Sequence, residues 1–286
     1  MGFYRIGRFE VEGRDLARTA VAVSTLIPRS TLLRSQKAAR RWASAARRQL
    51  GIDEDISGLE LVDPDEQYVV APLHEGFADV LLLAHLPLDL RFVVRDELFE
   101  WTWLGRSLKV TNQIMVRPEG RVAGYRQLLA DAKSTFDLGQ SLVVFPQGSI
   151  LGIEAAFRHG PFRIADRLAK RVLPVVITGT HRVWEHPYTN RLRFGQPVSM
   201  EVLDPLPVGA AVAGMGEIEH TMKRVALSPK MAPARRFDPE RDGYWDDYSY
   251  EIDSAFPEVA ELVARHRLAV GRESEIDTPM DGVGPT

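Results

Sequence analysis

The sequence predicts an α/β protein with a mostly parallel central sheet flanked by helices. From about residue 66, short runs rich in β-forming residues alternate with helical runs, which is the order of strand–helix–strand units. The 286 residues are 45% hydrophobic and 26% charged, a composition typical of globular proteins. Both observations favour strands that are buried between two helical layers.

Six β-rich runs give the predicted strands, and five runs with helical periodicity give the predicted helices. The predicted strands cover residues 67–73, 91–94, 113–116, 141–145, 173–177 and 191–194. The predicted helices cover residues 78–84, 97–103, 122–138, 161–170 and 215–227. We assign residues 61–228 to this α/β domain and expect reactive groups where its strands end.

Residues 1–60 form a predicted N-terminal segment with a basic amphipathic helix over residues 30–50. Residues 16–52 contain no acidic side chain and eight basic ones: Arg18, Arg29, Arg34, Lys37, Arg40, Arg41, Arg47 and Arg48. The apolar positions recur at helical spacing, at Leu32, Ala39, Trp42, Ala46 and Leu50. One interpretation places the basic face on anionic lipid, with Trp42 and the leucines in the interface. The other is a helix packed on the core with its basic face in water.

Composition and charge restrict the chemical sites and the partners that the protein can have. The chain has no cysteine, which excludes disulfides, thiol nucleophiles and cysteine-held metals. Its net charge of −3 argues against a nucleic-acid partner. No apolar stretch reaches the roughly 20 residues that span a bilayer. Together with the basic helix, this predicts a cytoplasmic protein, peripheral at the inner face of the membrane.

Residues 229–286 form a predicted C-terminal extension that lies over the domain surface. Its first part is rich in proline, arginine, aromatic and acidic residues, especially around residues 243–246. Residues 259–270 are predicted to form a last helix, and the residues from 271 on a disordered tail.

The clearest candidate for chemistry is the segment from Leu73 to Asp79. A β-run leads into His74, Gly76 permits a tight turn, and Asp79 lies in the first turn of the following helix, where its charge is favoured. We expect the Asp79 carboxylate to fold back onto the imidazole of His74 and to fix its tautomer. The other ring nitrogen could then take a proton from a hydroxyl. The alternative is a histidine that merely caps a buried turn.

Further polar residues follow later predicted strands. The run from Ile114 ends in Arg117, and one guanidinium so placed suits a phosphate or carboxylate. The strand that ends at Phe145 leads into Pro146-Gln147-Gly148-Ser149, where backbone N–H groups and a hydroxyl could face a polar ligand.

In this order and spacing, these segments resemble the glycerol-phosphate acyltransferase superfamily, the 1-acylglycerol-3-phosphate acyltransferase-like enzymes. That family carries His-x4-Asp, a strand motif ending in Arg, Phe-Pro-Glu-Gly-Thr-Arg, and a Val-Pro-Val-rich strand. The corresponding segments of this chain are residues 74–79, 114–117, 145–150 and 173–177. Residues 92–98, Gly105 and residues 195–197 echo further family features, so the resemblance covers about residues 66–200.

The resemblance implies an O-acyltransferase that moves a fatty acyl group from coenzyme A or acyl carrier protein to a hydroxyl. The acceptor would be a lysophospholipid or a glycerol-phosphate-like alcohol, as in phospholipid biosynthesis. His74 would be the general base and Asp79 its orienting carboxylate, with oxyanion donors from the turns near Gly76 or Gly148. Neither a cofactor nor a metal is implied. The residues that would bind the acceptor are Arg117, Gln147, Gly148, Ser149 and Arg158.

Three positions of the third motif depart from the family. Gln147, Ser149 and Ile150 stand where the family has Glu, Thr and Arg. In the family, that Glu and Arg contribute to binding the phosphate-bearing acceptor, and a dianionic phosphate without the Arg lacks charge-assisted hydrogen bonds. Either Arg158 supplies the missing cation, or the acceptor is a less charged alcohol.

Other classes of function fit less well. A serine hydrolase needs Gly-x-Ser-x-Gly, which is absent. A metal site built from His181, Glu185 and His186 departs from the His-x-x-Glu-His pattern. A non-catalytic lipid-binding or membrane-adaptor protein on the same fold remains the main alternative.

Overall fold

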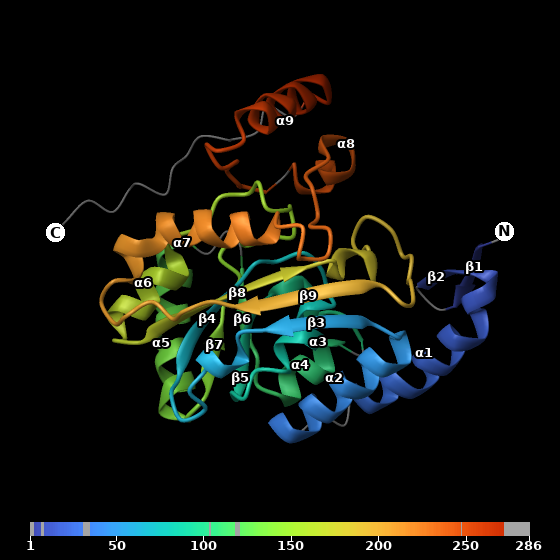
Figure 1. Cartoon of the computed structure of the whole chain (residues 1–286), viewed down its shortest axis with the longest axis horizontal. Helices are drawn as coiled ribbons and strands as arrows, with labels where there is room; N and C mark the ends of the chain where they lie inside the picture. The colour runs from blue at the N-terminus through green and yellow to red at the C-terminus, as the bar shows by residue number, and fades with distance from the viewer. Residues whose placement is uncertain are drawn as a thin grey trace.

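A seven-stranded sheet forms the centre of the computed structural model, which describes residues 3–6, 9–30, 35–102, 104–117, 121–246 and 248–271 (Figure 1). The strand order is β3-β9-β8-β4-β7-β5-β6, and every neighbouring pair is parallel except β8 and β9. This confirms the predicted mostly parallel sheet. The strands are β3 Asp53–Ser57, β4 Tyr68–Pro72, β5 Leu90–Arg95, β6 Ile114–Val116, β7 Ser141–Val143, β8 Arg171–Thr178 and β9 Pro197–Val202.

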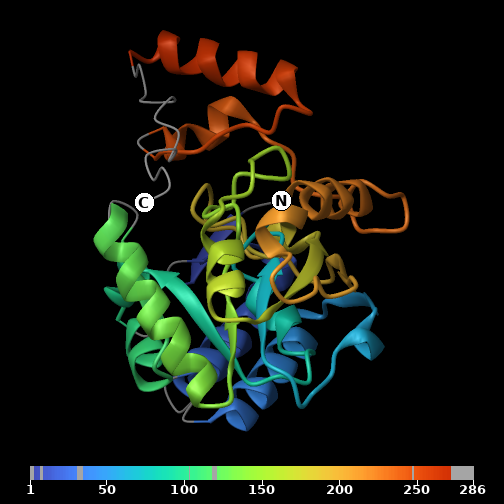
Figure 2. The same ribbon diagram turned by 90° about the vertical axis from the view of Figure 1, so that its left-hand side faces the viewer.

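Helices cover both faces of the sheet (Figures 1 and 2). Along β4, Tyr68 and Val70 pack into a core shared with α1, α2 and α3, whereas Val69 and Ala71 pack against α5, α6 and α7. This alternation is the period of two that a strand imposes on a sheet buried on both faces. The helices are α1 Leu16–Ser30, α2 Gln36–Leu50, α3 Asp79–Leu83, α4 Leu104–Val110, α5 Arg121–Asp137, α6 Gly160–Arg167, α7 Ala211–Ala226, α8 Pro239–Asp242 and α9 Pro257–Ala269.

Several elements differ from those predicted. Residues 191–194 make only isolated bridges, and the strand of this region is β9, which begins at Pro197. Edge strand β3 was missed because its sequence is polar and only alternate side chains are partly buried. In place of the predicted helix 97–103, the described residues form a 3₁₀ turn, η3 (Asp96–Phe99), and α4 begins at Leu104, whereas residue 103 lies outside the described residues. A further small hairpin precedes α1, formed by β1 Phe3–Ile6 and β2 Phe9–Glu12. The domain boundary at residue 61 stays a prediction, and β3 lies ahead of it.

Helix α2 packs its apolar stripe against the protein. Trp42 donates a hydrogen bond from Nε1 to the carbonyl oxygen of Leu26 at 3.0 Å, and Leu50 is buried in the core. Arg47 is also buried, 2.6 Å from a carboxylate oxygen of Glu54. These contacts favour the interpretation that the helix packs on the core, insertion of Trp42 and the leucines into a membrane interface stays a prediction, and Leu32 lies outside the described residues. None of the described helices is both long and apolar enough to cross a bilayer.

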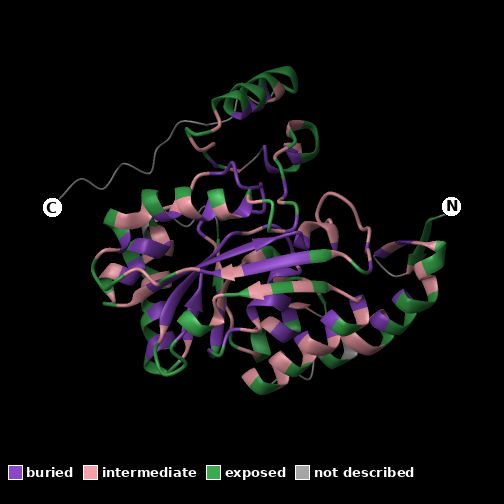
Figure 3. Ribbon diagram, viewed as in Figure 1, coloured by how far each residue is buried: buried purple, intermediate pink, exposed green. Residues whose placement is uncertain are grey.

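The C-terminal segment, defined here as residues 229–271, builds a third core over the loop that follows β7. Figure 2 shows α8 and α9 above this yellow-green loop, and Figure 3 shows that the outer face of α9 is exposed. A bridge between Ala155 and Ile252 joins the loop to the segment. The buried members of this core are Ile150, Leu151, Ala155, Trp245, Tyr250, Val259 and Val263. The segment is thus an integral layer of the fold. The tail from residue 272 lies outside the described residues.

The buried Tyr250 predicts that this layer weakens at alkaline pH. Burial raises the pKa of Tyr250 to about 12. In an unfolded chain a tyrosine ionises near pH 10, so the unfolded state binds fewer protons between about pH 10 and pH 12 and stability falls as pH rises. We expect this group to remove about 2 to 3 kcal/mol of unfolding free energy over that interval. Urea unfolding should show a shallower pH dependence for Tyr250→Phe, and equal slopes would contradict the prediction.

Candidate active site

The site lies at the carboxyl edge of three neighbouring strands, β4, β7 and β5. His74 follows β4 by two residues, the turn of residues 145–149 follows β7, and Arg95 is the last residue of β5. In parallel sheets this edge is where ligands bind, because the loops that leave the strands converge there. Because β4 lies between β8 and β7, His74 lies between the loop that follows β8 and the turn that follows β7.

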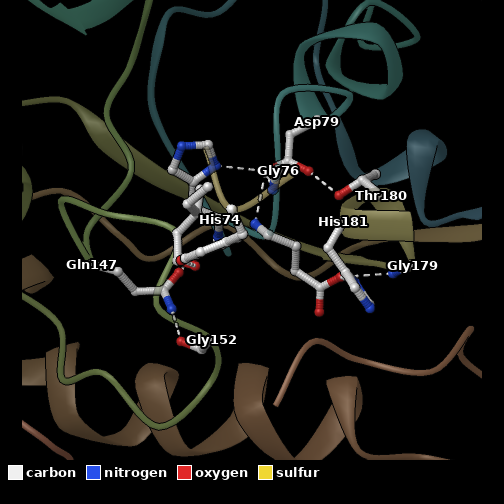
Figure 4. A network of polar contacts seen from close by, with 11 residues as sticks. His74, Gly76, Asp79, Gln147, Gly152, Gly179, Thr180 and His181 are labelled. Carbon is white, nitrogen blue, oxygen red and sulfur yellow. Dashed lines mark hydrogen bonds and ion pairs between the residues drawn. The ribbon is translucent and has the colours of Figure 1, made fainter. Parts of the chain in front are cut away.

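His74 and Asp79 are in contact, as the sequence predicts. His74 Nδ1 lies 2.6 Å from Asp79 Oδ2, and Figure 4 shows the carboxylate turned back onto the ring. Asp79 is fully buried, whereas the His74 side chain is 22% exposed. The ring also stacks on Phe145, with centroids 3.9 Å apart. With Nδ1–H donated to the carboxylate, Nε2 is left as a proton acceptor.

Asp79 is held by more than the imidazole. The backbone N–H groups of Glu75 and Gly76 donate to Oδ2 at 2.9 and 3.2 Å, and the Thr180 hydroxyl donates to Oδ1. The tight turn at Gly76 aims these N–H groups at the start of α3, where the helix dipole favours a carboxylate. Four donors thus fix the carboxylate, and through it the plane of the His74 ring.

Glu75 is a buried neighbour of His74 whose importance the sequence does not reveal. It accepts hydrogen bonds from the N–H of Gly179 at 2.7 Å, from His181 Nδ1 at 3.0 Å and from the N–H of Arg235 at 2.6 Å. Burial raises the pKa of its carboxyl group. Glu75 therefore ties the turn after His74 to the loop after β8 and to the C-terminal segment. These partners are far away in sequence, so no local pattern indicates them.

Gln147 supports His74 from the third-motif turn. Its Oε1 accepts a hydrogen bond from the His74 N–H at 2.7 Å, and its Nε2 donates to the Gly152 carbonyl oxygen (Figure 4). A carboxylate could accept but not donate, so these two contacts explain an amide here. Because both ends of the amide are engaged, direct contact between Gln147 and an acceptor stays a prediction. Ser149 is 8% exposed, and its Oγ has no hydrogen-bond partner among the described residues.

The turns near Gly76 and Gly148 are the expected sources of oxyanion donors, and the N–H groups of the two glycines themselves are already engaged. The Gly76 N–H donates to Asp79, and the Gly148 N–H donates to the Phe145 carbonyl oxygen at 3.1 Å. These two N–H groups are therefore occupied in this conformation, and an oxyanion donor from a neighbouring residue of either turn stays a prediction. The left-handed φ of +72° at Gly148 still requires glycine, because a side chain there would be strained.

The two arginines predicted to bind the acceptor lie in different places. Arg117 leaves edge strand β6 with a 72% exposed side chain, 3.3 Å from Asp96 Oδ2. At about 4.8 Å per strand, the three steps from β4 to β6 place it about 14 Å away from His74. Arg158 lies nearer, since its N–H donates to the Pro146 carbonyl oxygen at 2.8 Å. Burial and the charge of Arg95 lower the pKa of Arg158.

The residues weighed for a metal site have separate partners. His181 contacts Glu75, Glu185 lies 3.1 Å from an Arg193 nitrogen, and His186 packs against the ring of Trp101. Within the described part of the chain, no group of three metal-ligating side chains gathers.

Comparisons with known proteins agree with the geometry. Residues 54–178 match the family model described as Acyltransferase. The chain is 28% identical over 170 residues to a 1-acyl-sn-glycerol-3-phosphate acyltransferase of Chlamydomonas reinhardtii, which covers 58% of this chain and 50% of that protein. It is 24% identical over 166 residues to the enzyme of the same name from Bacillus subtilis, over 57% of this chain and 82% of that protein. The chain therefore spans about half the length of the algal relative.

A solved structure shares the fold. It is the 1-acyl-sn-glycerophosphate acyltransferase of Thermotoga maritima, with a TM-score of 0.54, 21% identity, and coverage of 74% of this chain and 92% of that one. Three observations indicate an acyltransferase. They are the parallel sheet, the paired histidine and aspartate at its edge, and the family match over residues 54–178. Residues 54–178 form an acyltransferase-family region, and the chain is similar over this region to proteins of the glycerol-phosphate acyltransferase superfamily, in particular the 1-acylglycerol-3-phosphate acyltransferase-like proteins.

Proposed function

We propose that this protein is an O-acyltransferase that moves a fatty acyl group from a thioester to a hydroxyl of a lysophospholipid or glycerol-phosphate-like acceptor. One observation carries the proposal: a partly exposed imidazole at the sheet edge lies 2.6 Å from a fully buried carboxylate. A histidine that only capped a turn would not need a carboxylate fixed by three further donors. The names of the relatives support phospholipid synthesis as the setting.

The mechanism follows from the free nitrogen of His74. Nε2 removes the proton of the acceptor hydroxyl while the oxygen attacks the thioester carbonyl carbon. The C–S bond then breaks, the acyl group stays on the acceptor oxygen as an ester, and the thiolate takes the proton from the imidazolium. Asp79 keeps the ring in place and stabilises its positive charge. Arg117, Gln147, Gly148, Ser149 and Arg158 form the proposed acceptor side of the site.

The test supplies the purified protein with acyl coenzyme A and lysophosphatidate. Release of free thiol, together with mass-spectrometric detection of the diacyl product, is the expected result. An acyl carrier protein thioester should be tried in parallel as donor. A protein that binds liposomes but releases no thiol with any acceptor would instead be the lipid-binding adaptor.

A less charged alcohol is the second candidate acceptor, and Ile150 favours it. Ile150 is 5% exposed and packs in the third core, so position 150 offers no cation to a phosphate. Monoacylglycerol is the matched acceptor without phosphate. A higher kcat/KM for monoacylglycerol than for lysophosphatidate would select this candidate.

The proposal includes a peripheral position at the cytoplasmic face of a membrane, through the exposed basic side chains of α2. Lys37, Arg41 and Arg48 are exposed on this helix. Each basic residue near an anionic surface contributes about 1 kcal/mol, so reversing all three charges to Glu should weaken binding to phosphatidylserine vesicles by more than about a hundredfold. Vesicle co-sedimentation at low and high salt measures this.

The matched control reverses three exposed basic residues in the opposite helical layer, Arg126, Lys133 and Arg163. It has the same net charge as the α2 variant and should bind vesicles much more tightly. Equal binding by the two variants would mean that α2 does not face the membrane.

A further inference from the structure

Two arginines beside the site are held by consecutive residues of the C-terminal segment. The Arg95 guanidinium lies 4.2 Å from the centroid of the Tyr248 ring. The Arg158 guanidinium donates from Nη2 to the carbonyl oxygen of Ser249. The Tyr248 hydroxyl donates to Glu97 Oε1 at 3.0 Å, and the same oxygen lies 2.8 Å from Arg95 Nη2. Residues 248 and 249 thus fix both guanidinium groups.

The two cations are close enough to repel one another. The charge of Arg95 contributes to the lowered pKa of Arg158, after the larger effect of burial. Among the described residues, Arg95 Nε is buried and has no hydrogen-bond partner. Glu97 is the only carboxylate within 4.0 Å of either guanidinium in the described part of the chain. A pair of cations with one partly exposed carboxylate is a favourable place for a further anion.

One member of this pair, Arg158, lies against the turn that supports the general base, and the other can reach toward it. A Cβ built on Gly148 would be 3.1 Å from Arg158 Nε, so the Arg158 side chain lies against the turn that Gln147 joins to His74. Arg95 ends β5, which is two strands away from β4, or about 10 Å. The Arg95 side chain is long enough to extend from β5 toward β4. It can therefore contact a group that is attached to the alcohol bound at His74.

The C-terminal segment also buries position 150, where the family has an arginine. Ile150 is buried beneath Trp245 and Tyr250, and its carbonyl oxygen accepts a hydrogen bond from Tyr188 at 3.3 Å. Trp245 Nε1 in turn donates to the Tyr188 hydroxyl at 2.5 Å. The C-terminal segment thereby buries position 150 away from any ligand. Its residues Tyr248 and Ser249 hold the guanidinium groups of Arg95 and Arg158 instead.

We propose that the C-terminal segment completes the acceptor site, with Tyr248 as the positioning residue that, with the Ser249 carbonyl, orients Arg95 and Arg158 toward the acceptor's phosphate. This inference rests on the proposed acyl transfer. It assigns a phosphate-bearing acceptor to a chain that lacks a cation at position 150. Tyr248 acts through the arginines and does not touch the reacting atoms.

The test separates acceptor binding from turnover in Tyr248→Leu, which keeps an apolar contact but removes the aromatic face. Loss of a partly desolvated cation–π contact should raise the KM for lysophosphatidate about tenfold. The kcat and the KM for acyl coenzyme A should stay within about twofold, and the KM for monoacylglycerol should not change. Tyr248→Phe keeps the ring and should restore most of the affinity.

Tyr244→Leu is the matched control, because Tyr244 packs on Trp245 and Tyr248 but is half exposed.

Binding of sn-glycerol 3-phosphate gives a readout without turnover. We expect it to raise the melting temperature of the unsubstituted protein and of Tyr244→Leu, and to raise it much less in Tyr248→Leu and Arg158→Gln. A KM that rises equally for lysophosphatidate and monoacylglycerol would overturn the inference, because it would indicate a general structural role. A rise confined to acyl coenzyme A would also overturn it, since the cations would then serve the donor's phosphates.

The two proposals can fail separately. If no thioester and acceptor react, the proposed function fails, whereas glycerol 3-phosphate binding that Tyr248→Leu weakens would still support the phosphate site. If the enzyme is active but Tyr248→Leu changes neither the KM for lysophosphatidate nor glycerol 3-phosphate binding, only this inference fails.

Discussion

Replacing His74 with alanine is expected to lower the kcat of acyl transfer by about 10³-fold. A positioned general base contributes roughly 10²- to 10⁴-fold, and no other described imidazole contacts Asp79. The His74 backbone N–H still donates to Gln147 in the variant, so the third-motif turn keeps its support. Thiol release under saturating acyl coenzyme A and acceptor measures the effect.

The matched control is His220→Ala, on the exposed surface of α7. It should turn over like the unsubstituted protein. Both variants should bind vesicles equally, since His74 lies at the sheet edge and not on α2. Full activity in His74→Ala, with an unchanged circular dichroism spectrum, would contradict the assigned role and favour a capping histidine.

The central strands could be predicted because their side chains are buried on both faces. β4 and β8 are continuous apolar runs with burial throughout or nearly so, and such runs stand out in any sequence. The contact of His74 with Asp79 could also be predicted, because the two residues are only five positions apart in a short connection between a strand and a helix. Local sequence therefore specified the central strands and the base with its carboxylate.

Long-range contacts could not be predicted. The bonds from Glu75 to Gly179 and Arg235 join residues more than a hundred positions apart. The apolar stripe of α2 has the same pattern whether it packs on protein or on lipid, so sequence alone left both interpretations open. Arg117 matches a family motif, yet its place on an edge strand depends on the sheet order, which no single strand encodes.

Asp79→Asn should lower kcat by about 10²- to 10⁴-fold while it changes stability little. The amide oxygen can still accept from His74 and from the N–H groups of Glu75 and Gly76. The new NH₂ group can donate to Thr180, whose hydroxyl is able to rotate and accept. What is lost is the negative charge beside an imidazolium in a fully buried place, so catalysis suffers most.

The comparison that isolates charge is with Asp79→Ala, which leaves the donors of Glu75 and Gly76 without a buried acceptor. Each unsatisfied buried donor costs about 1 to 3 kcal/mol, so urea unfolding should show a clear loss for Ala and about 1 kcal/mol or less for Asn. Turnover should be low in both. If Asp79→Asn kept full activity while Arg117→Ala abolished it, the acceptor arginine and not the buried carboxylate would control the reaction. The four hydrogen bonds to Asp79 would then only stabilise the turn after β4.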